Sequence, residues 1–115
     1  MTSKRVPAVF VTTQPRNYEH AREIARLALK YRLPAMFAEP VSVRFGGLMA
    51  YTPDWVDLSR KAANNVDRIL KGAKPSDLPI EFSTKFELLI NMRTARTLGL
   101  SIPPSLLLRA DHIIE

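Results

Sequence analysis

The start of the chain carries the pattern of a β-α-β unit. Residues 6–12 form a β-branched, apolar run without polar alternation, which is typical of a strand buried on both faces. Apolar residues then recur at helical spacing over residues 18–32, and Leu33-Pro34 ends that helix before a second apolar run at residues 35–38. The pattern predicts a central parallel strand, a helix and a second parallel strand. The carboxyl ends of both strands should lie at one edge of the sheet.

A third strand and a long amphipathic helix are expected next. Gly46-Gly47 precedes an apolar run at residues 48–51. Thr52-Pro53-Asp54 predicts a helix start, because Thr caps, Pro suits the first helical position and Asp complements the helix dipole. The helix should run from Asp54 to Leu70 and stop at Gly72. Its apolar stripe consists of Trp55, Leu58, Ala62, Val66, Ile69 and Leu70.

The remaining residues predict a connection, a strand and two short helices. Two prolines favour an extended connection over residues 73–79, and residues 85–90 have the composition of a strand. Asn91 should cap a short helix that ends at Gly99. A last helix is expected over residues 105–114, after a pair of prolines. The alternation of strands and helices predicts the α/β class.

Length and composition favour a single domain over residues 1–115. Apolar residues make up 46% and charged residues 24% of the sequence, as in ordinary soluble domains. There is no cysteine, and His20 and His112 lie far apart without clustered acids, so we expect no metal site and no cofactor. Glycine-rich nucleotide motifs and the context of a nucleophilic serine are also missing. We therefore expect a binding protein rather than an enzyme.

The basic character of the chain is best explained by a solvated surface. The net charge is +6, from 17 basic and 11 acidic residues. Arg22, Arg26 and Lys30 alternate with Glu19 and Glu23 at helical spacing, which suits surface pairing better than a phosphate-binding stripe. We expect no nucleic-acid partner. The apolar stretches fall short of the roughly 20 residues of a membrane-spanning helix, so no membrane insertion is expected.

A few side chains near predicted strand ends are candidates for ligand contact. Glu39 follows an apolar strand at the edge where α/β folds bind ligands, although a solvated loop acid is an equal alternative. Tyr51 ends the third strand beside a helix N-terminus, and a half-buried hinge tyrosine is the equal alternative there. Asp54 is better explained as a helix cap, and Trp55 as a core residue.

Nearly the whole chain from Ala8 onward resembles the carboxy-terminal region of ABC transporter substrate-binding proteins. The resemblance is carried by residues 46–54, by residues 62–79, by Lys-Phe-Glu-Leu at 85–88 and by Ile-Pro-Pro-Ser-Leu at 102–106. It implies two Rossmann-like lobes of the type I periplasmic-binding kind, which close around a solute. This chain would be a truncated, α/β part of such a protein, its carboxy-terminal domain.

The resemblance also implies where a solute and a partner protein bind. In such folds the ligand is held by residues at strand ends and hinges. Carried onto this sequence, those positions are Thr13, Gln14, Glu39, Tyr51 and Thr52. By analogy the solute is a small organic molecule such as an amino acid or a carboxylate, and the partner is an ABC transporter permease.

The compartment stays open between two alternatives. The start of the chain is basic but lacks the apolar stretch of a signal peptide, so the cytoplasm is an alternative to the periplasm that the resemblance implies.

The function has an alternative as well. The apolar stripe of the helix over residues 54–70 would face the first lobe in a two-lobed protein. A homodimer that covers this stripe with a second copy, and binds no solute, is therefore the alternative function.

Overall fold

The computed structural model describes residues 7–115, which fall into two compact units. Residues 1–6, with the basic start and the first residue of the first expected strand, lie outside the described residues. The larger unit comprises residues 7–52 and 87–115, and the smaller one is Pro53–Phe86. The elements in chain order are β1 (Val9–Val11), α1 (Pro15–Glu19), α2 (Ala21–Lys30), β2 (Ala35–Phe37), α3 (Val41–Arg44), β3 (Met49–Pro53), α4 (Trp55–Leu70), η1 (Pro75–Asp77), β4 (Phe86–Asn91), α5 (Met92–Leu98), α6 (Pro104–Leu107) and β5 (His112–Ile114).

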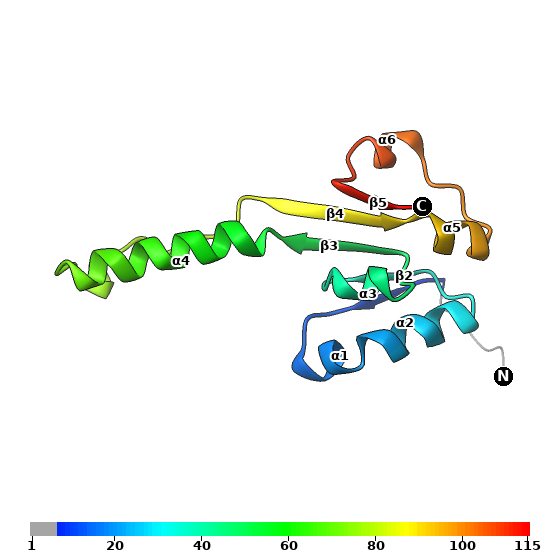
Figure 1. The fold of residues 1–115 in the computed structure, drawn as a ribbon, viewed down its shortest axis with the longest axis horizontal. Helices are drawn as coiled ribbons and strands as arrows, with labels where there is room; N and C mark the ends of the chain where they lie inside the picture. The colour runs from blue at the N-terminus through cyan, green and yellow to red at the C-terminus, as the bar shows by residue number, and fades with distance from the viewer. Residues whose placement is uncertain (1–6) are drawn as a thin grey trace. The chain divides into compact units, whose positions relative to one another are not determined.

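A five-stranded sheet in the order β1-β2-β3-β4-β5 forms the centre of the larger unit (Figure 1). The expected parallel β-α-β unit is confirmed, because β1 pairs in parallel with β2 and β2 with β3. β5 is parallel to β4. The N–H of Asn91, at the end of β4, donates to the carbonyl of Leu48, just before β3, at 2.8 Å. β4 therefore runs antiparallel to β3, and the carboxyl ends of β1, β2 and β3 share an edge with the first residues of β4 and β5.

One face of the sheet carries the core of the larger unit. Successive strand residues face opposite sides, so the alternate apolar residues of β1 to β4 form one surface, and helices α2 and α3 pack on it. The core cluster consists of Ala25, Ala35, Phe37, Val43, Ala50 and Leu89, with Val9, Val11, Ile24, Ala28 and Ile114 packed against it.

The expectation of a central first strand, buried on both faces, is wrong. β1 lies at the end of the strand order, with β2 as its neighbour. Val9 and Val11 pack against the core, but Phe10 faces the other side and is 58% exposed. A β-branched run fits a half-buried strand as well as a fully buried one, because sequence does not record what covers the second face.

Helix α3 was not expected from the sequence, and buried polar contacts fix it to the sheet. The side-chain amide of Asn91 donates to the carbonyl of Val43 at 3.0 Å, and the hydroxyl of Thr94 donates to the carbonyl of Gly46 at 2.9 Å. The Oδ1 of Asn91 accepts from the N–H of Thr94 at 3.1 Å, so its expected role as cap of α5 is confirmed. The carboxyl end of α3 is thus held on β4 and the start of α5.

The last expected helix, over residues 105–114, is wrong in its second half. Helix α6 stops at Leu107, and β5 follows. Asp111 fixes the start of this strand, because its N–H donates to the carbonyl of Leu88 at 2.9 Å and its Oδ2 accepts from the N–H of Leu88 at 2.8 Å. A short apolar run fits helix and strand equally well, and here these tertiary contacts decide for the strand.

The smaller unit is built on α4, which begins one residue later than expected. Thr52-Pro53 belongs to β3, so the expected cap at Thr52 is wrong. Asp54 is the cap instead, and its Oδ1 accepts from the N–H groups of Val56 and Asp57, both at 3.0 Å. A capping carboxylate both satisfies free N–H groups and complements the helix dipole. Asp54 can therefore stabilise the start of α4 as well as the expected threonine cap.

The end of α4 agrees with the sequence pattern. Gly72 has a φ of +102°, and Ala73 donates its N–H back to the carbonyl of Arg68 at 3.0 Å, which makes a glycine-based helix end. The connection that follows was expected to be extended, but η1 adds a short helical turn to it.

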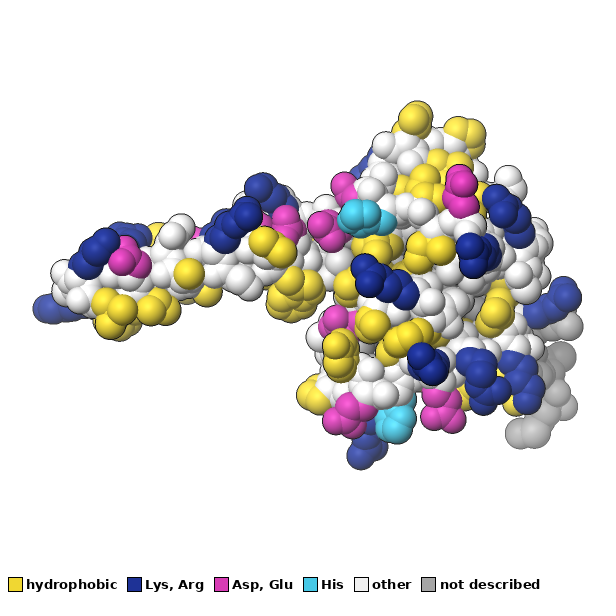
Figure 2. All heavy atoms as spheres, viewed as in Figure 1, with side chains coloured by type: hydrophobic (Ala, Val, Ile, Leu, Met, Phe, Trp, Pro, Cys, Tyr) yellow, Lys and Arg dark blue, Asp and Glu magenta, His cyan; other side chains and the backbone are white. Residues whose placement is uncertain are grey.

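The apolar stripe of α4 is exposed. Within this unit no side chain of α4 is buried, and Figure 2 shows hydrophobic side chains along one side of the helix. Trp55, expected in the core, is 51% exposed. The other large apolar side chains exposed on this unit are Val56, Val66, Ile69, Leu70, Ile80, Phe82 and Phe86. Among the described residues, no helix has the length and apolar character needed to cross a membrane.

Candidate functional site

The sheet brings all five expected ligand residues to one edge. Because β1, β2 and β3 run in parallel, the residues that follow them lie together at their carboxyl ends. Thr13 and Gln14 follow β1, Glu39 follows β2, and Tyr51 and Thr52 lie near the end of β3. We call this the sheet-edge site.

The loop after β1 presents two polar side chains to solvent. The side-chain amide of Asn17 donates to the carbonyl of Thr12 at 2.9 Å and closes the loop. Gln14 is the extended residue before α1, and its side chain makes no capping bond. Thr13 and Gln14 are both exposed, so their hydrogen-bonding groups are accessible to a solute.

The neighbours Tyr51 and Thr52 differ sharply in exposure. Tyr51 is 47% exposed and Thr52 is 1% exposed, because adjacent strand residues face opposite sides of the sheet. Tyr51 therefore offers its ring at the surface, whereas Thr52 is part of the packed interior. Glu39 is half-buried between β2 and α3, where its carbonyl accepts from the N–H of Ser42 at 3.3 Å.

A pocket of about 350 Å³ opens between α3 and the strands β4 and β5, and we call it the α3 pocket. Three ionisable side chains stand in its wall: Arg44 at the end of α3, Glu87 in β4 and His112 in β5. None of the three makes an ion pair or a hydrogen bond within the described part of the chain. Figure 2 shows histidine, basic and hydrophobic side chains side by side on this unit. The full lining is Pro40, Arg44, Glu87, Leu89, His112, Ile113 and Ile114.

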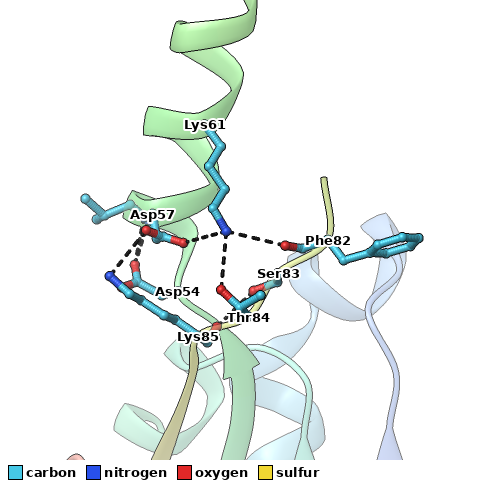
Figure 3. A network of polar contacts seen from close by, with 8 residues as sticks. Asp54, Asp57, Lys61, Phe82, Ser83, Thr84 and Lys85 are labelled. Carbon is cyan, nitrogen blue, oxygen red and sulfur yellow. Dashed lines mark hydrogen bonds and ion pairs between the residues drawn. The ribbon is translucent and has the colours of Figure 1, made fainter. Parts of the chain in front are cut away.

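A separate polar network lies within the smaller unit (Figure 3). The Asp57 carboxylate lies 3.1 Å from the Nζ of Lys61 and 3.4 Å from the Nζ of Lys85. Lys61 also donates to the carbonyl of Phe82 and the hydroxyl of Thr84, each at 3.4 Å. The network joins the segment before β4 to the first turns of α4. Its charges are already partnered, so we assign it a structural role.

The two lysines keep Asp57 ionised. The hydrogen bond from Lys61 lowers the pKa of the Asp57 carboxyl below its usual range. Partial desolvation acts in the opposite direction, and the hydrogen bond from Lys85 adds to the lowering. The carboxylate therefore stays charged at neutral pH, and it can form ion pairs with both lysines.

The exposed groups of the sheet-edge site and of the α3 pocket suit reversible binding of a small molecule. They offer hydrogen-bonding, aromatic and charged side chains. Within residues 7–115, no group of three or more His, Cys, Asp or Glu side chains is close enough to hold a metal ion. His20, which lies between α1 and α2, is exposed, and its Nδ1 is 3.8 Å from a carboxylate oxygen of Glu23.

Sequence reasoning missed the three ionisable residues of the α3 pocket, which are Arg44, Glu87 and His112. Pro40 directly precedes α3, and a proline is common at the start of a helix. That sign could have predicted helix α3, which bears Arg44. His112 could not be found in this way, because its segment has the pattern of a helix.

The sequence matches one protein family. Residues 1–114 match the family described as ABC transporter substrate binding protein. No curated protein matches the sequence.

Three solved structures share the fold. A conserved domain protein from Vibrio cholerae O1 biovar El Tor strain N16961 has a TM-score of 0.85 and 22% identity over 93% of this chain and 36% of its own. The ABC domain from Streptococcus pneumonia in complex with L-Trp has a TM-score of 0.84 and 27% identity over 96% of this chain and 38% of its own. The ligand-free, open structure of CD0873 from Clostridium difficile, a substrate-binding protein with adhesive properties, has a TM-score of 0.67 and 21% identity over 92% of this chain and 36% of its own. The chain thus spans between 36% and 38% of the length of these proteins.

Proposed function

Because the chain belongs to the family of ABC transporter substrate-binding proteins, we propose that it forms part of the solute-binding site of an ABC-type uptake system. The expected α/β fold of the periplasmic-binding-protein kind is confirmed by the similar structures. The observation that carries the proposal is the sheet-edge site, where three parallel strands end together. Open α/β sheets bind ligands outside the carboxyl ends of their strands.

The proposed solute is a small organic molecule such as an amino acid or a carboxylate. The related protein from Streptococcus pneumonia, at 27% identity, was solved with L-Trp. At the sheet-edge site of this chain, the exposed Tyr51 ring would stack on an apolar group. Glu39 would pair with an ammonium group, and Thr13 and Gln14 would supply hydrogen bonds.

The proposal includes the whole protein. Residues 1–115 would be a single carboxy-terminal domain of a two-lobed binding protein, within which Pro53–Phe86 is a compact unit of its own. Two observations support this proposal: the chain spans little more than a third of the similar proteins, and the apolar stripe of α4 is exposed. The partner would be an ABC permease and the compartment the periplasm, with the cytoplasm as the alternative. The function is binding, without a reaction.

Titration by NMR tests this function. We expect the 115-residue chain to bind L-tryptophan with a Kd in the millimolar range, which is a binding free energy of about −4 kcal/mol. Binding should be weak because the second lobe of a two-lobed site is needed to close around the solute. Saturable shifts should appear at the amides of Thr13, Gln14 and Tyr51. Tyr51→Ala and Glu39→Ala should weaken binding, while the folded spectrum is retained.

Glu81→Ala is the matched control, since Glu81 is an exposed acid of the smaller unit. Binding in the sub-micromolar range would contradict the two-lobed argument. Unchanged affinity in both sheet-edge variants would contradict the site. If neither amino acids nor carboxylates gave a saturable shift at concentrations up to about 20 mM, the binding function itself would be wrong.

One alternative has its own observation. The exposed stripe of α4 is also the surface that a homodimeric interaction module would bury, with a second copy of the chain in place of another lobe. Such a module would bind no solute. The mass of the chain in solution, measured by sedimentation equilibrium, tests this alternative.

A further inference from the structure

The α3 pocket combines both signs of charge with an apolar floor. Its volume of about 350 Å³ lies in the range of small-molecule sites, roughly 300–1,000 Å³. Arg44 contributes a guanidinium and Glu87 a carboxylate, while Leu89 and Ile114 form apolar lining. A pocket with both charges and an apolar floor is complementary to a molecule that has an ammonium, a carboxylate and an apolar body.

The walls of the pocket are fixed before any ligand arrives. The wall that bears Arg44 is held by the buried bond from Asn91 to the carbonyl of Val43. The wall that bears His112 is held by the paired bonds between Asp111 and Leu88. Groups on preorganised walls lose little conformational entropy on binding, so less of the interaction free energy of their contacts is offset.

The charges in the pocket lack partners from this chain. The side chains of Arg44 and Glu87 make no ion pair with each other or with another described residue, and the imidazole of His112 makes no hydrogen bond to a described residue. Arg44 is exposed and Glu87 is half-buried, so both can meet a ligand. The planar guanidinium of arginine matches a carboxylate with two parallel hydrogen bonds.

We propose that the α3 pocket binds the charged head of a small zwitterion, with Arg44 on its carboxylate and Glu87 on its ammonium. The apolar body of the zwitterion lies against Leu89 and Ile114, and His112 supplies a further polar contact at the rim. The inference rests on the proposed function, because it concerns the same class of solute. It adds a second binding pocket to the sheet-edge site, and this pocket selects zwitterions over plain carboxylates.

Three probes of one shape separate the two charges. Leucine carries both charged groups, isocaproate lacks the ammonium, and isoamylamine lacks the carboxylate. Each is titrated into the labelled 115-residue chain, and the methyl signals of Leu89, Ile113 and Ile114 are followed by NMR. Leucine should bind at least about tenfold more tightly than either analogue, because each analogue leaves one charge of the pocket unpaired.

Two charge-removing variants assign the roles. Arg44→Gln should weaken leucine and isocaproate about tenfold and strengthen isoamylamine, because a repulsive cation is removed. Glu87→Gln should weaken leucine and isoamylamine and strengthen isocaproate, because a repulsive carboxylate is removed. Arg26→Gln and Glu81→Gln are the matched controls, since both side chains are exposed and lie outside the pocket.

The outcomes distinguish this inference from the function it rests on. Leucine shifts confined to Thr13, Gln14 and Tyr51 would keep the proposed function and overturn the pocket. Equal effects of Arg44→Gln and Glu87→Gln on all three probes would show that the two side chains pair with each other instead. No saturable shift at about 50 mM leucine would overturn both proposals. The comparison of the three probes on the unmodified chain decides the matter even if a variant does not fold.

Discussion

Asn91 shows how much a single side chain contributes to the larger unit. Its side chain is 5% exposed and makes two kinds of bond. The oxygen caps α5 by accepting from Thr94, and the nitrogen donates to Val43 at the end of α3. One amide thus joins the end of β4 to two helices, and it holds the wall that carries Arg44.

Two substitutions of Asn91 separate these roles. Asn91→Ala should lower the free energy of unfolding by about 2–4 kcal/mol, because a cap is lost and a buried carbonyl is left without its donor. Asn91→Ser should cost less, since serine is also a good cap but does not reach Val43. Urea unfolding measures both losses. Equal losses for the two variants would mean that the capping bond contributes nothing.

Among the elements, α4 depends on its polar network rather than on burial. No side chain of the helix is buried within its own unit, so apolar packing there is slight. The bonds from Lys61 and Lys85 to Asp57, together with those from Lys61 to Phe82 and Thr84, join the returning segment to the helix. The conformation of residues 82–85 should therefore follow the charge of Asp57.

This dependence predicts an effect of pH. The folded-state pKa of Asp57 is lowered, so its contribution is fully present above the unfolded value of about 3.9 and is lost as the pH falls through the folded value. The amide signals of Thr84 and Lys85 should be constant from neutral pH to about pH 4 and move below it. Asp57→Asn should show the low-pH positions already at neutral pH.

Asp67→Asn is the control for this effect. Asp67 pairs with Lys71 at 2.8 Å on an exposed face, so its loss should leave Thr84 and Lys85 unchanged. If Asp57→Asn also left these signals in place, the network would not hold the segment.

At the scale of the whole molecule, the apolar stripe of α4 is exposed to water and lacks a surface that covers it. Leaving a large apolar side chain in water forgoes roughly 1.5–3 kcal/mol relative to burying it, and a small domain has only about 5–15 kcal/mol of stability. Trp55, Val66, Ile69 and Leu70 are all exposed. In the isolated chain, a second copy is the nearest surface that can cover them.

The isolated chain should therefore form a homodimer or a larger oligomer. Sedimentation equilibrium at tens of micromolar protein should give at least twice the monomer mass of 13.0 kDa. Ile69→Glu should shift the chain to monomer, while Asn64→Glu, on the opposite side of the helix, should not. A mass of 13.0 kDa for the unmodified chain would rule out the dimer.

The sequence by itself determined the local features of this protein. The β-α-β unit, the end of α4 at Gly72, the cap at Asn91 and the stop at Gly99 all follow from hydrophobic spacing and from capping and glycine chemistry, which act between residues near in sequence. The positions of Thr13, Glu39 and Tyr51 at one sheet edge follow from the same pattern, because parallel strands must end on the same side.

Only the tertiary structure decided which surfaces are covered and which charges meet. The edge position of β1, the strand at residues 112–114 and the burial of Thr52 beside the exposed Tyr51 depend on neighbours distant in the chain. At Gly47, an added Cβ would lie 2.6 Å from the ring of Phe37, a constraint set by packing. The α3 pocket has the same origin: Arg44, Glu87 and His112 come together because the sheet joins their elements, and no spacing in the sequence records that contact.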